Sequence, residues 1–284
     1  MAAQWTDHNV TVTSGGADLT FTVSSIGDED ATDVVIALHG FPQSRRCWRA
    51  VGSGLAAQGL RVIAPDQRGY SPGARPVGTE NYRMPRLVDD VLHLADALGV
   101  ERFHLLGHDW GAQVGWVVCE RAADRVQTFT ALSVPHPQAY ATAYRDDPDQ
   151  REAAAYIRIF WQPGTAEDWL SGNDWAILRT ILGDLPPEDI DHYVGRFQEP
   201  GAMTAALEWY RAMAPAEDFP STTVPTTYVW STEDQALRRA GAQLCERFVA
   251  ADYRFVVLDG VSHWIPDQAP EAVVDAVLDR VARA

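Results

Sequence analysis

The stretch that decides the fold is GHDWGA, residues 107–112, which lies between the apolar runs FHLL and QVGWVV. Burying an unpaired charge is costly, so an aspartate in such surroundings needs a structural reason. Gly107, Gly111 and Ala112 stand at positions −2, +2 and +3 relative to Asp109. Small neighbours permit a sharp turn from a strand into a helix, in which the central residue is strained. The pattern predicts that Asp109 projects from the carboxyl end of a buried strand, although Asp is also favoured at an ordinary helix N-cap.

Strand-like and helix-like segments alternate along the chain. Runs rich in β-branched and aliphatic residues predict strands at residues 33–40, 60–66, 103–109, 126–133, 226–231 and 253–260. Between them, amphipathic or apolar segments predict helices at residues 86–98, 111–123, 238–248 and 270–282. Such alternation is typical of an α/β fold with a mainly parallel sheet flanked by helices. Residues 9–13 and 18–25, which are split by the turn SGGA, predict an antiparallel hairpin that leads into this sheet.

The alternation stops between about Pro135 and Pro220 and resumes at Val224. The intervening stretch is rich in Trp, Tyr, Pro and acidic residues and contains no strong strand pattern. We therefore expect an α/β core formed by residues 1–134 and 221–284, with residues 135–220 inserted as a helical cap. A chain of 284 residues that is 46% hydrophobic can bury such a core without disulfides.

Composition narrows the classes of partner. The formal net charge is −16, which repels a phosphate backbone, so nucleic acid and anionic membranes are not expected partners. The opening residues MAAQWTDHNV lack the basic and apolar regions of a signal peptide, and we expect a cytoplasmic location. Cys47, Cys119 and Cys245 lack C-x-x-C spacing and are expected to be reduced core residues. The histidines show no metal-ligand spacing, so no metal cofactor is expected.

Two further motifs accompany the aspartate turn. HGFPQS, residues 39–44, follows a predicted strand, and GVSHWIPDQAPE, residues 260–271, carries His263 between the last predicted strand and the last predicted helix. Together these motifs resemble the α/β-hydrolase superfamily, in particular its aspartate-nucleophile branch, which includes epoxide hydrolases and haloalkane dehalogenases. The resemblance implies that Asp109 is the nucleophile and His263 the base. It also implies that the backbone amides of Phe41 and Trp110 form the oxyanion hole.

The third member of the implied triad lies in STEDQAL, residues 231–237. The family pattern favours Asp234 as the acid that orients His263, although Ser231 replaces the usual glycine and Glu233 remains an alternative. In this chemistry a carboxylate displaces a leaving group at a saturated carbon and becomes an alkyl ester. The oriented histidine then activates water to hydrolyse that ester.

Two segments of the insertion bear on the leaving group. YIRIFWQPG, residues 156–164, and LEWYR, residues 207–211, resemble epoxide hydrolase segments in which two cap tyrosines point at the epoxide oxygen. The resemblance implies that Tyr156 and Tyr210 donate to that oxygen, and that the enzyme converts a small apolar epoxide and water to a vicinal diol without a cofactor. Tyr140, Tyr144 and Tyr193 match less well, and their expected role is structural.

Two other functions remain open on the sequence alone. A haloalkane dehalogenase would use the same triad, and the ring N–H of Trp110 could hold a halide. Some dehalogenases have an asparagine as the second hydrogen-bond donor to the halide, and Phe41 stands at that position here. The ring N–H of Trp161, Trp169 or Trp175 could supply this second donor instead. A non-catalytic ligand-binding relative is the other alternative, although the complete triad argues against it. The specific substrate, its stereochemistry, the pathway and the oligomeric state, including a possible homo-oligomer, do not follow from the sequence.

Overall fold

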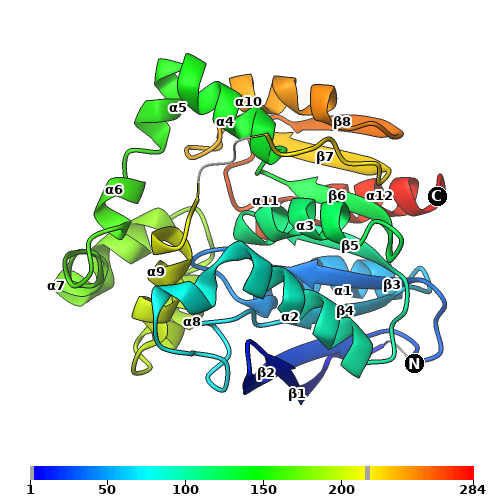
Figure 1. The fold of residues 1–284 in the computed structure, drawn as a ribbon, viewed down its shortest axis with the longest axis horizontal. Coiled ribbons are helices and arrows are strands. Elements are labelled where there is room, and N and C mark those ends of the chain that lie inside the picture. Colours follow the sequence, from blue (N-terminus) through cyan, green and yellow to red (C-terminus); the bar gives the residue numbers. More distant parts are fainter. Residues whose placement is uncertain (1–2, 215–217) are drawn as a thin grey trace.

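The computed structural model describes residues 3–214 and 218–284, and within them the chain forms one eight-stranded sheet with helices on both faces (Figure 1). The strand order is β1-β2-β4-β3-β5-β6-β7-β8. The strands are β1 (Thr6–Ser14), β2 (Ala17–Ile26), β3 (Val34–Leu38), β4 (Arg61–Pro65), β5 (Phe103–His108), β6 (Val126–Leu132), β7 (Thr226–Ser231) and β8 (Tyr253–Leu258). Strands β3 to β8 are parallel, whereas β2 pairs antiparallel with both β1 and β4. The predicted, mainly parallel α/β sheet is therefore confirmed.

The predicted hairpin is formed by β1 and β2. Ser14 pairs with Ala17, which leaves Gly15 and Gly16 as a two-residue loop. Both glycines have positive φ angles, 66° and 83°. A turn with two positive φ values matches the right-handed twist of the flanking strands, and glycine adopts it without steric cost.

The central strands are covered on both faces, which explains why they are apolar throughout. Successive side chains of a strand point to opposite faces of the sheet. In β3, Val35 and Ala37 join one hydrophobic cluster, whereas Ile36 and Leu38 join another. Helices α1, α11 and α12 pack on the first face, and α2 and α3 pack on the second. These helices span Arg49–Ala56, Ile265–Gln268, Pro270–Val281, Met84–Ala97 and Trp110–Arg121, respectively.

Helices α4 to α9 lie between β6 and β7 in the chain. They are α4 (Pro137–Asp146), α5 (Pro148–Ala153), α6 (Ile157–Phe160), α7 (Thr165–Ile181), α8 (Pro187–Phe197) and α9 (Ala202–Arg211). Helices α5 to α9 gather beside one end of the sheet strands (Figure 1). Proline begins α4, α5 and α8, where its missing N–H costs no helical hydrogen bond. Helix α7 is interrupted at Gly172 to Trp175, whose φ and ψ angles are not helical.

Shorter elements complete the described chain. Helix α10 (Arg239–Leu244) packs against α4, and 3-10 turns occur at Arg45–Trp48, Thr79–Tyr82 and Cys245–Phe248. The three cysteines are buried and free, as the sequence predicts. In the ranges 3–214 and 218–284, none of the helices combines the length and apolar character needed to cross a membrane.

Candidate active site

Asp109 occupies the sharp turn between β5 and α3. Its φ and ψ angles are 51° and −121°, a conformation that residues other than glycine rarely adopt. The small residues around it are required by close backbone contacts. A Cβ atom on Gly111 would collide with the carbonyl oxygen of Leu38, and one on Gly107 would lie 2.5 Å from the carbonyl oxygen of Gly111. The turn therefore presents the Asp109 side chain beyond the carboxyl end of β5, as the sequence pattern predicts.

The two oxygens of the Asp109 carboxylate have different surroundings. Oδ1 accepts a hydrogen bond of 2.8 Å from the backbone N–H of Phe41. Burial raises the pKa of Asp109, while the charge of His263 and hydrogen bonds from the amides of Trp110 and Phe41 oppose that rise. The loop that carries Phe41 approaches closely because Gly40 has no side chain, and a Cβ there would overlap the Asp109 carboxylate. Of the two amides proposed for an oxyanion hole, that of Phe41 thus donates to the carboxylate in this structure.

Asp109 Oδ2 faces His263 instead. The distance from Oδ2 to His263 Nε2 is 3.7 Å, and both side chains retain 13% exposure. On the other side of the ring, His263 Nδ1 lies 2.9 Å from Asp234 Oδ2. The three residues come from loops that follow β5, β7 and β8, and they meet at the carboxyl edge of the sheet.

Asp234 is fully surrounded by donors. Its Oδ1 accepts backbone hydrogen bonds of 2.8 Å and 2.9 Å from Ala236 and Leu237. Its Oδ2 accepts from the hydroxyl of Ser133 at 2.8 Å as well as from His263. Burial alone would raise the pKa of Asp234, but the charge of His263 and these hydrogen bonds lower it. The alternative acid in the same loop, Glu233, is exposed, so the structure brings Asp234 and not Glu233 to the histidine.

Tyr156 and Tyr210 approach Asp109 from the inserted helices. Tyr156 lies between α5 and α6, Tyr210 belongs to α9, and their ring centroids are 6.4 Å apart. The Tyr210 ring lies 5.5 Å from that of Phe41, whose amide binds Asp109, and 5.1 Å from that of Trp110, which follows Asp109 in the chain. Burial raises the pKa of both phenols well above 10, and the negative charge of Asp109 raises both further. Both hydroxyls are therefore protonated at neutral pH.

Polar contacts hold the inserted helices against the sheet. The ring N–H of Trp209 in α9 donates to the carbonyl oxygen of Arg68 at 2.9 Å. Arg196 in α8 donates to Asp66 at 3.0 Å, just after the carboxyl end of β4. Within the insertion, the ring N–H of Trp161 donates to the carbonyl oxygen of Tyr210 at 2.9 Å. These contacts place α8 and α9 over the carboxyl edge of the sheet, where the triad lies.

Comparison with known proteins agrees with this geometry. A family model described as the alpha/beta hydrolase family matches residues 35–276. The chain belongs to the alpha/beta hydrolase family. This hydrolase is 34% identical over 270 residues to the AB hydrolase superfamily protein YfhM of Bacillus subtilis, and the match covers 92% of this chain and 94% of the relative. It is 33% identical over 295 residues to epoxide hydrolase A of Mycobacterium tuberculosis, with 88% of this chain and 91% of the relative covered.

Solved structures of epoxide hydrolases share the fold of this hydrolase. Epoxide hydrolase A from Mycobacterium thermoresistibile superposes with a TM-score of 0.83 at 27% identity, over 98% of both chains. A structure from a set of novel epoxide hydrolases from metagenomes of hot environments superposes with a TM-score of 0.86 at 30% identity, over 98% of this chain and 100% of that one. These matches confirm the predicted fold class and the predicted resemblance to epoxide hydrolases.

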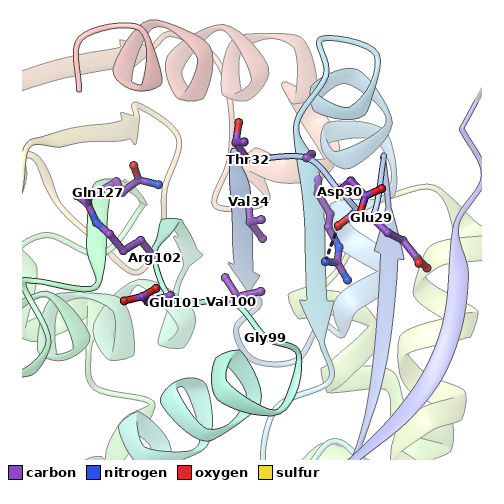
Figure 2. Close-up of a pocket in the computed structure, with 11 residues that line it drawn as sticks. Glu29, Asp30, Thr32, Val34, Gly99, Val100, Glu101, Arg102 and Gln127 are labelled. Atoms are coloured by element: carbon purple, nitrogen blue, oxygen red, sulfur yellow. Dashed lines mark hydrogen bonds between the residues drawn. The ribbon is translucent and has the colours of Figure 1, made fainter.

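A surface hollow of the hydrolase lies at the opposite edge of the sheet (Figure 2). Its lining includes Val34 and Arg61, which begin β3 and β4, together with residues 99–102 ahead of β5. It therefore lies at the amino ends of the parallel strands, away from Asp109. In the described part of the chain, no group of three or more His, Cys, Asp or Glu side chains is placed to hold a metal ion. Activity without a cofactor stays a prediction.

The site of this hydrolase also contains residues that the sequence motifs did not indicate. Ser133 follows β6 and contacts both Asp234 and His263. His108, directly before Asp109, donates from Nε2 to the carbonyl oxygen of His263 at 2.8 Å. Burial lowers the pKa of His108 to about 3, so this ring is neutral at physiological pH. Only the position of Ser133 at the end of a predicted strand could have drawn attention to it.

Proposed function

We propose that this hydrolase opens epoxides to vicinal diols through a covalent ester on Asp109. The observation that carries the proposal is the position of two protonated phenols, Tyr156 and Tyr210, whose rings are 6.4 Å apart and whose pKa values are both raised further by the charge of Asp109. Opening an epoxide generates an alkoxide, which needs a proton, whereas a departing halide does not. The relatives named epoxide hydrolase A support the same assignment.

In the first step, Asp109 Oδ2 attacks an epoxide carbon and the carbon–oxygen bond of the ring breaks. Oδ2 is the attacking atom because Oδ1 is held by the amide of Phe41. Tyr156 and Tyr210 donate hydrogen bonds to the epoxide oxygen, and one phenol transfers its proton to the alkoxide. The products of this step are a hydroxyalkyl ester on Asp109 and a tyrosinate.

In the second step, His263 Nε2 removes a proton from water and the resulting hydroxide attacks Cγ of the Asp109 ester. The negative charge of the tetrahedral intermediate develops on Oδ1, beside the amides of Phe41 and Trp110, which stabilise it. Collapse of the intermediate expels the diol and restores the carboxylate. The proton released in the hydrolysis returns to the tyrosinate, so epoxide and water yield diol with no net change in the enzyme.

The haloalkane dehalogenase alternative has less support. The ring N–H of Trp161 is engaged by the carbonyl oxygen of Tyr210 and is not free to hold a halide. A side-chain hydrogen bond with Trp110 is among the contacts that act on the Tyr210 hydroxyl, whose pKa is raised mainly by burial. Trp161 is thus committed to the Tyr210 backbone, and the Tyr210 phenol serves an oxygen leaving group.

The inserted helices form the lid of the proposed pocket. Phe160, Phe197 and Tyr210 surround the ring of Phe41 at centroid distances of 5.4 Å, 5.8 Å and 5.5 Å. Apolar walls with a few convergent polar groups are typical of small-molecule sites. We assign residues 135–220 to a cap over the core formed by residues 1–134 and 221–284. The substrate is a small apolar epoxide, and water is the second reactant.

A single turnover in heavy-oxygen water tests the covalent mechanism. The chain contains no lysine, so trypsin releases residues 103–121, in which Asp109 and Glu120 are the acidic residues. With enzyme in excess over styrene oxide, we expect the label in Asp109 and unlabelled oxygen in the diol. The masses of fragment ions of this peptide distinguish label on Asp109 from label on Glu120. Label in the diol and none in Asp109 would overturn the mechanism, and tight binding without any diol would favour the non-catalytic alternative.

Removal of the phenols tests the leaving group. Tyr156→Phe and Tyr210→Phe should each lower kcat/KM for styrene oxide by about 10- to 100-fold, because each removes a hydrogen bond to developing negative charge. Tyr144→Phe is the matched control, since Tyr144 is exposed and stacks on Tyr140 at 6.2 Å. Release of bromide from a bromoalkane that is faster than diol formation, and unaffected in the double Tyr156→Phe/Tyr210→Phe variant, would favour the dehalogenase instead.

A further inference from the structure

Ser133 has an unusual backbone conformation at the carboxyl end of β6. Its φ angle is 69°, in the left-handed region that costs an ordinary L-residue free energy. Backbone contacts hold it there: its N–H donates to the carbonyl oxygen of Val229 at 2.9 Å, and its own carbonyl oxygen accepts from the hydroxyl of Tyr228 at 2.6 Å. The side chain is completely buried. A strained residue that its surroundings hold firmly is often one whose side chain must point in a particular direction.

The Ser133 hydroxyl points at the contact between Asp234 and His263. Its Oγ lies 2.8 Å from Asp234 Oδ2 and 3.1 Å from His263 Nδ1. Because Nδ1 and Oδ2 are themselves 2.9 Å apart, the three atoms form a closed triangle. Ionised Asp234 can only accept hydrogen bonds, so the single hydroxyl proton of Ser133 is donated to it. Oγ therefore presents a lone pair to Nδ1.

The geometry points to Ser133 as a positioning residue that keeps His263 in the tautomer needed for ester hydrolysis. Both atoms that face Nδ1, Asp234 Oδ2 and Ser133 Oγ, accept hydrogen bonds, so in the neutral ring the proton stays on Nδ1. The lone pair then lies on Nε2, which faces Asp109 at 3.7 Å. This inference rests on the proposed role of His263 as the base that activates water.

Ser133 also limits the basicity of Asp234. A hydrogen bond from the Ser133 hydroxyl is one of the contacts that lower the pKa of Asp234 against the effect of burial. Without that bond the carboxylate is more basic and stabilises the protonated imidazole more strongly. The loss of Oγ as a weak acceptor at Nδ1 would by itself lower the pKa of His263. The 2.8 Å bond to the charged carboxylate of Asp234 is the stronger contact, so its loss decides the direction and the pKa of His263 rises. His263 then gives up its proton at higher pH than in the wild-type enzyme.

Two other titratable groups face the His263 ring. Asp109 lies 3.7 Å from Nε2, and the ring of His108 lies 4.9 Å from the His263 ring. Burial keeps the pKa of His108 at about 3, so it does not change charge in the working range. Asp109 attacks through Oδ2 with help from the phenols, and Ser133 contacts neither. Ester formation therefore does not depend on the Ser133 hydroxyl, whereas ester hydrolysis does.

The test follows the two steps separately in the wild type, Ser133→Ala and Ser133→Gly. Rapid-quench mixing with styrene oxide, followed by intact-protein mass, measures the formation and decay of the ester. We expect the formation rate to stay within about 2-fold, the decay rate to fall by about 10-fold, and the ester to accumulate, because a hydrogen bond to a charged group is lost. The acidic limb of the pH profile of kcat should move to higher pH in both variants.

The paired variants separate the hydroxyl from the backbone. Glycine adopts the φ angle of 69° without strain, so a purely conformational role predicts that Ser133→Gly retains wild-type decay while Ser133→Ala does not. Tyr144→Phe is the control, because it removes an exposed phenol hydroxyl and leaves the contacts of Ser133 with Asp234, His263 and Tyr228 in place. It should leave the ratio of decay to formation unchanged. Equal losses in both steps, or an unmoved pH limb, would overturn the role of Ser133. Absence of any ester in the wild type would instead refute the proposed function.

Discussion

The protonation state of His263 depends on the charge of Asp109. Burial lowers the pKa of His263, but the charge and hydrogen bond of Asp234, together with the charge of Asp109, raise it to about 9. At pH 7 the resting enzyme lies below that value, so the ring is protonated. We predict that Asp109→Asn, which removes the charge and nearly preserves the shape, lowers the pKa of His263.

The size of this shift follows from the distance between the two side chains. His263 Nε2 and Asp109 Oδ2 are 3.7 Å apart. At that distance two unit charges interact by about 4.5 kcal/mol at an effective dielectric constant of about 20, and by about 1.1 kcal/mol at that of water. These energies correspond to about 3 and about 0.8 pKa units. Because the site is largely enclosed, we expect a fall of about 1 to 3 units, to a pKa of about 6 to 8.

Nuclear magnetic resonance of histidine-labelled protein, titrated from about pH 5 to about pH 10, measures this pKa directly. The chain has 8 histidines, and the signal that disappears in His263→Gln identifies the residue. Glu233→Gln is the matched control, because it removes the same charge from an exposed residue next to Asp234 and should not shift the titration. An unchanged pKa in Asp109→Asn, or an equal shift in Glu233→Gln, would refute the reasoning.

Three further predictions concern stability and the loop that binds Asp109. Arg68→Met leaves Asp90 without its bidentate partner in a pair whose side chains are 1% and 5% exposed, so the free energy of unfolding in urea should fall by about 3 to 5 kcal/mol. A fall below about 1 kcal/mol would contradict the burial of that pair. Gly40→Ala would place a Cβ 2.7 Å from Cγ of Asp109, so kcat/KM should drop by at least about 100-fold. Gly195→Ala in α8 is the control for a glycine replacement, because a Cβ added there has no atom within 4 Å. It should leave activity unchanged and add up to about 1 kcal/mol to the free energy of unfolding.

Much of the secondary structure could be predicted because its signals are local. The sequence predicts a strand at residues 226–231, and β7 spans Thr226–Ser231, since a short run of β-branched and aromatic residues bounded by turns has few other solutions. Strand β5 ends at His108, one residue earlier than expected, because Asp109 leaves the extended conformation at the sharp turn. The sequence does not predict the interruption of α7 at residues 172–175, since only Gly172 marks it.

Side-chain partners far apart in the chain were harder to predict. The turn at Asp109 and the amide of Phe41 belong to recognisable motifs, so their meeting could be anticipated. The choice between Glu233 and Asp234 depends on which of two adjacent side chains turns inward, and that direction is determined by the loop conformation. Ser133 contacts Asp234 and His263, which lie 101 and 130 positions later in the chain. A serine at the end of a strand gives no signal of such distant contacts.

The charge on Asp109 also orders the two steps of the proposed reaction. In the resting enzyme the carboxylate helps to keep His263 protonated, so the ring cannot remove a proton from water. Formation of the ester at Oδ2 removes that negative charge, and the pKa of His263 falls because one of the charges that raised it is gone. The ring then releases its proton to solvent and becomes a base, and it regains a proton from solvent when hydrolysis restores the carboxylate. Oδ1 already lies at the amide of Phe41, which stabilises the next intermediate. In the proposed mechanism, Asp109 is therefore both the nucleophile and the group that activates the base, and water is activated only after there is an ester to hydrolyse.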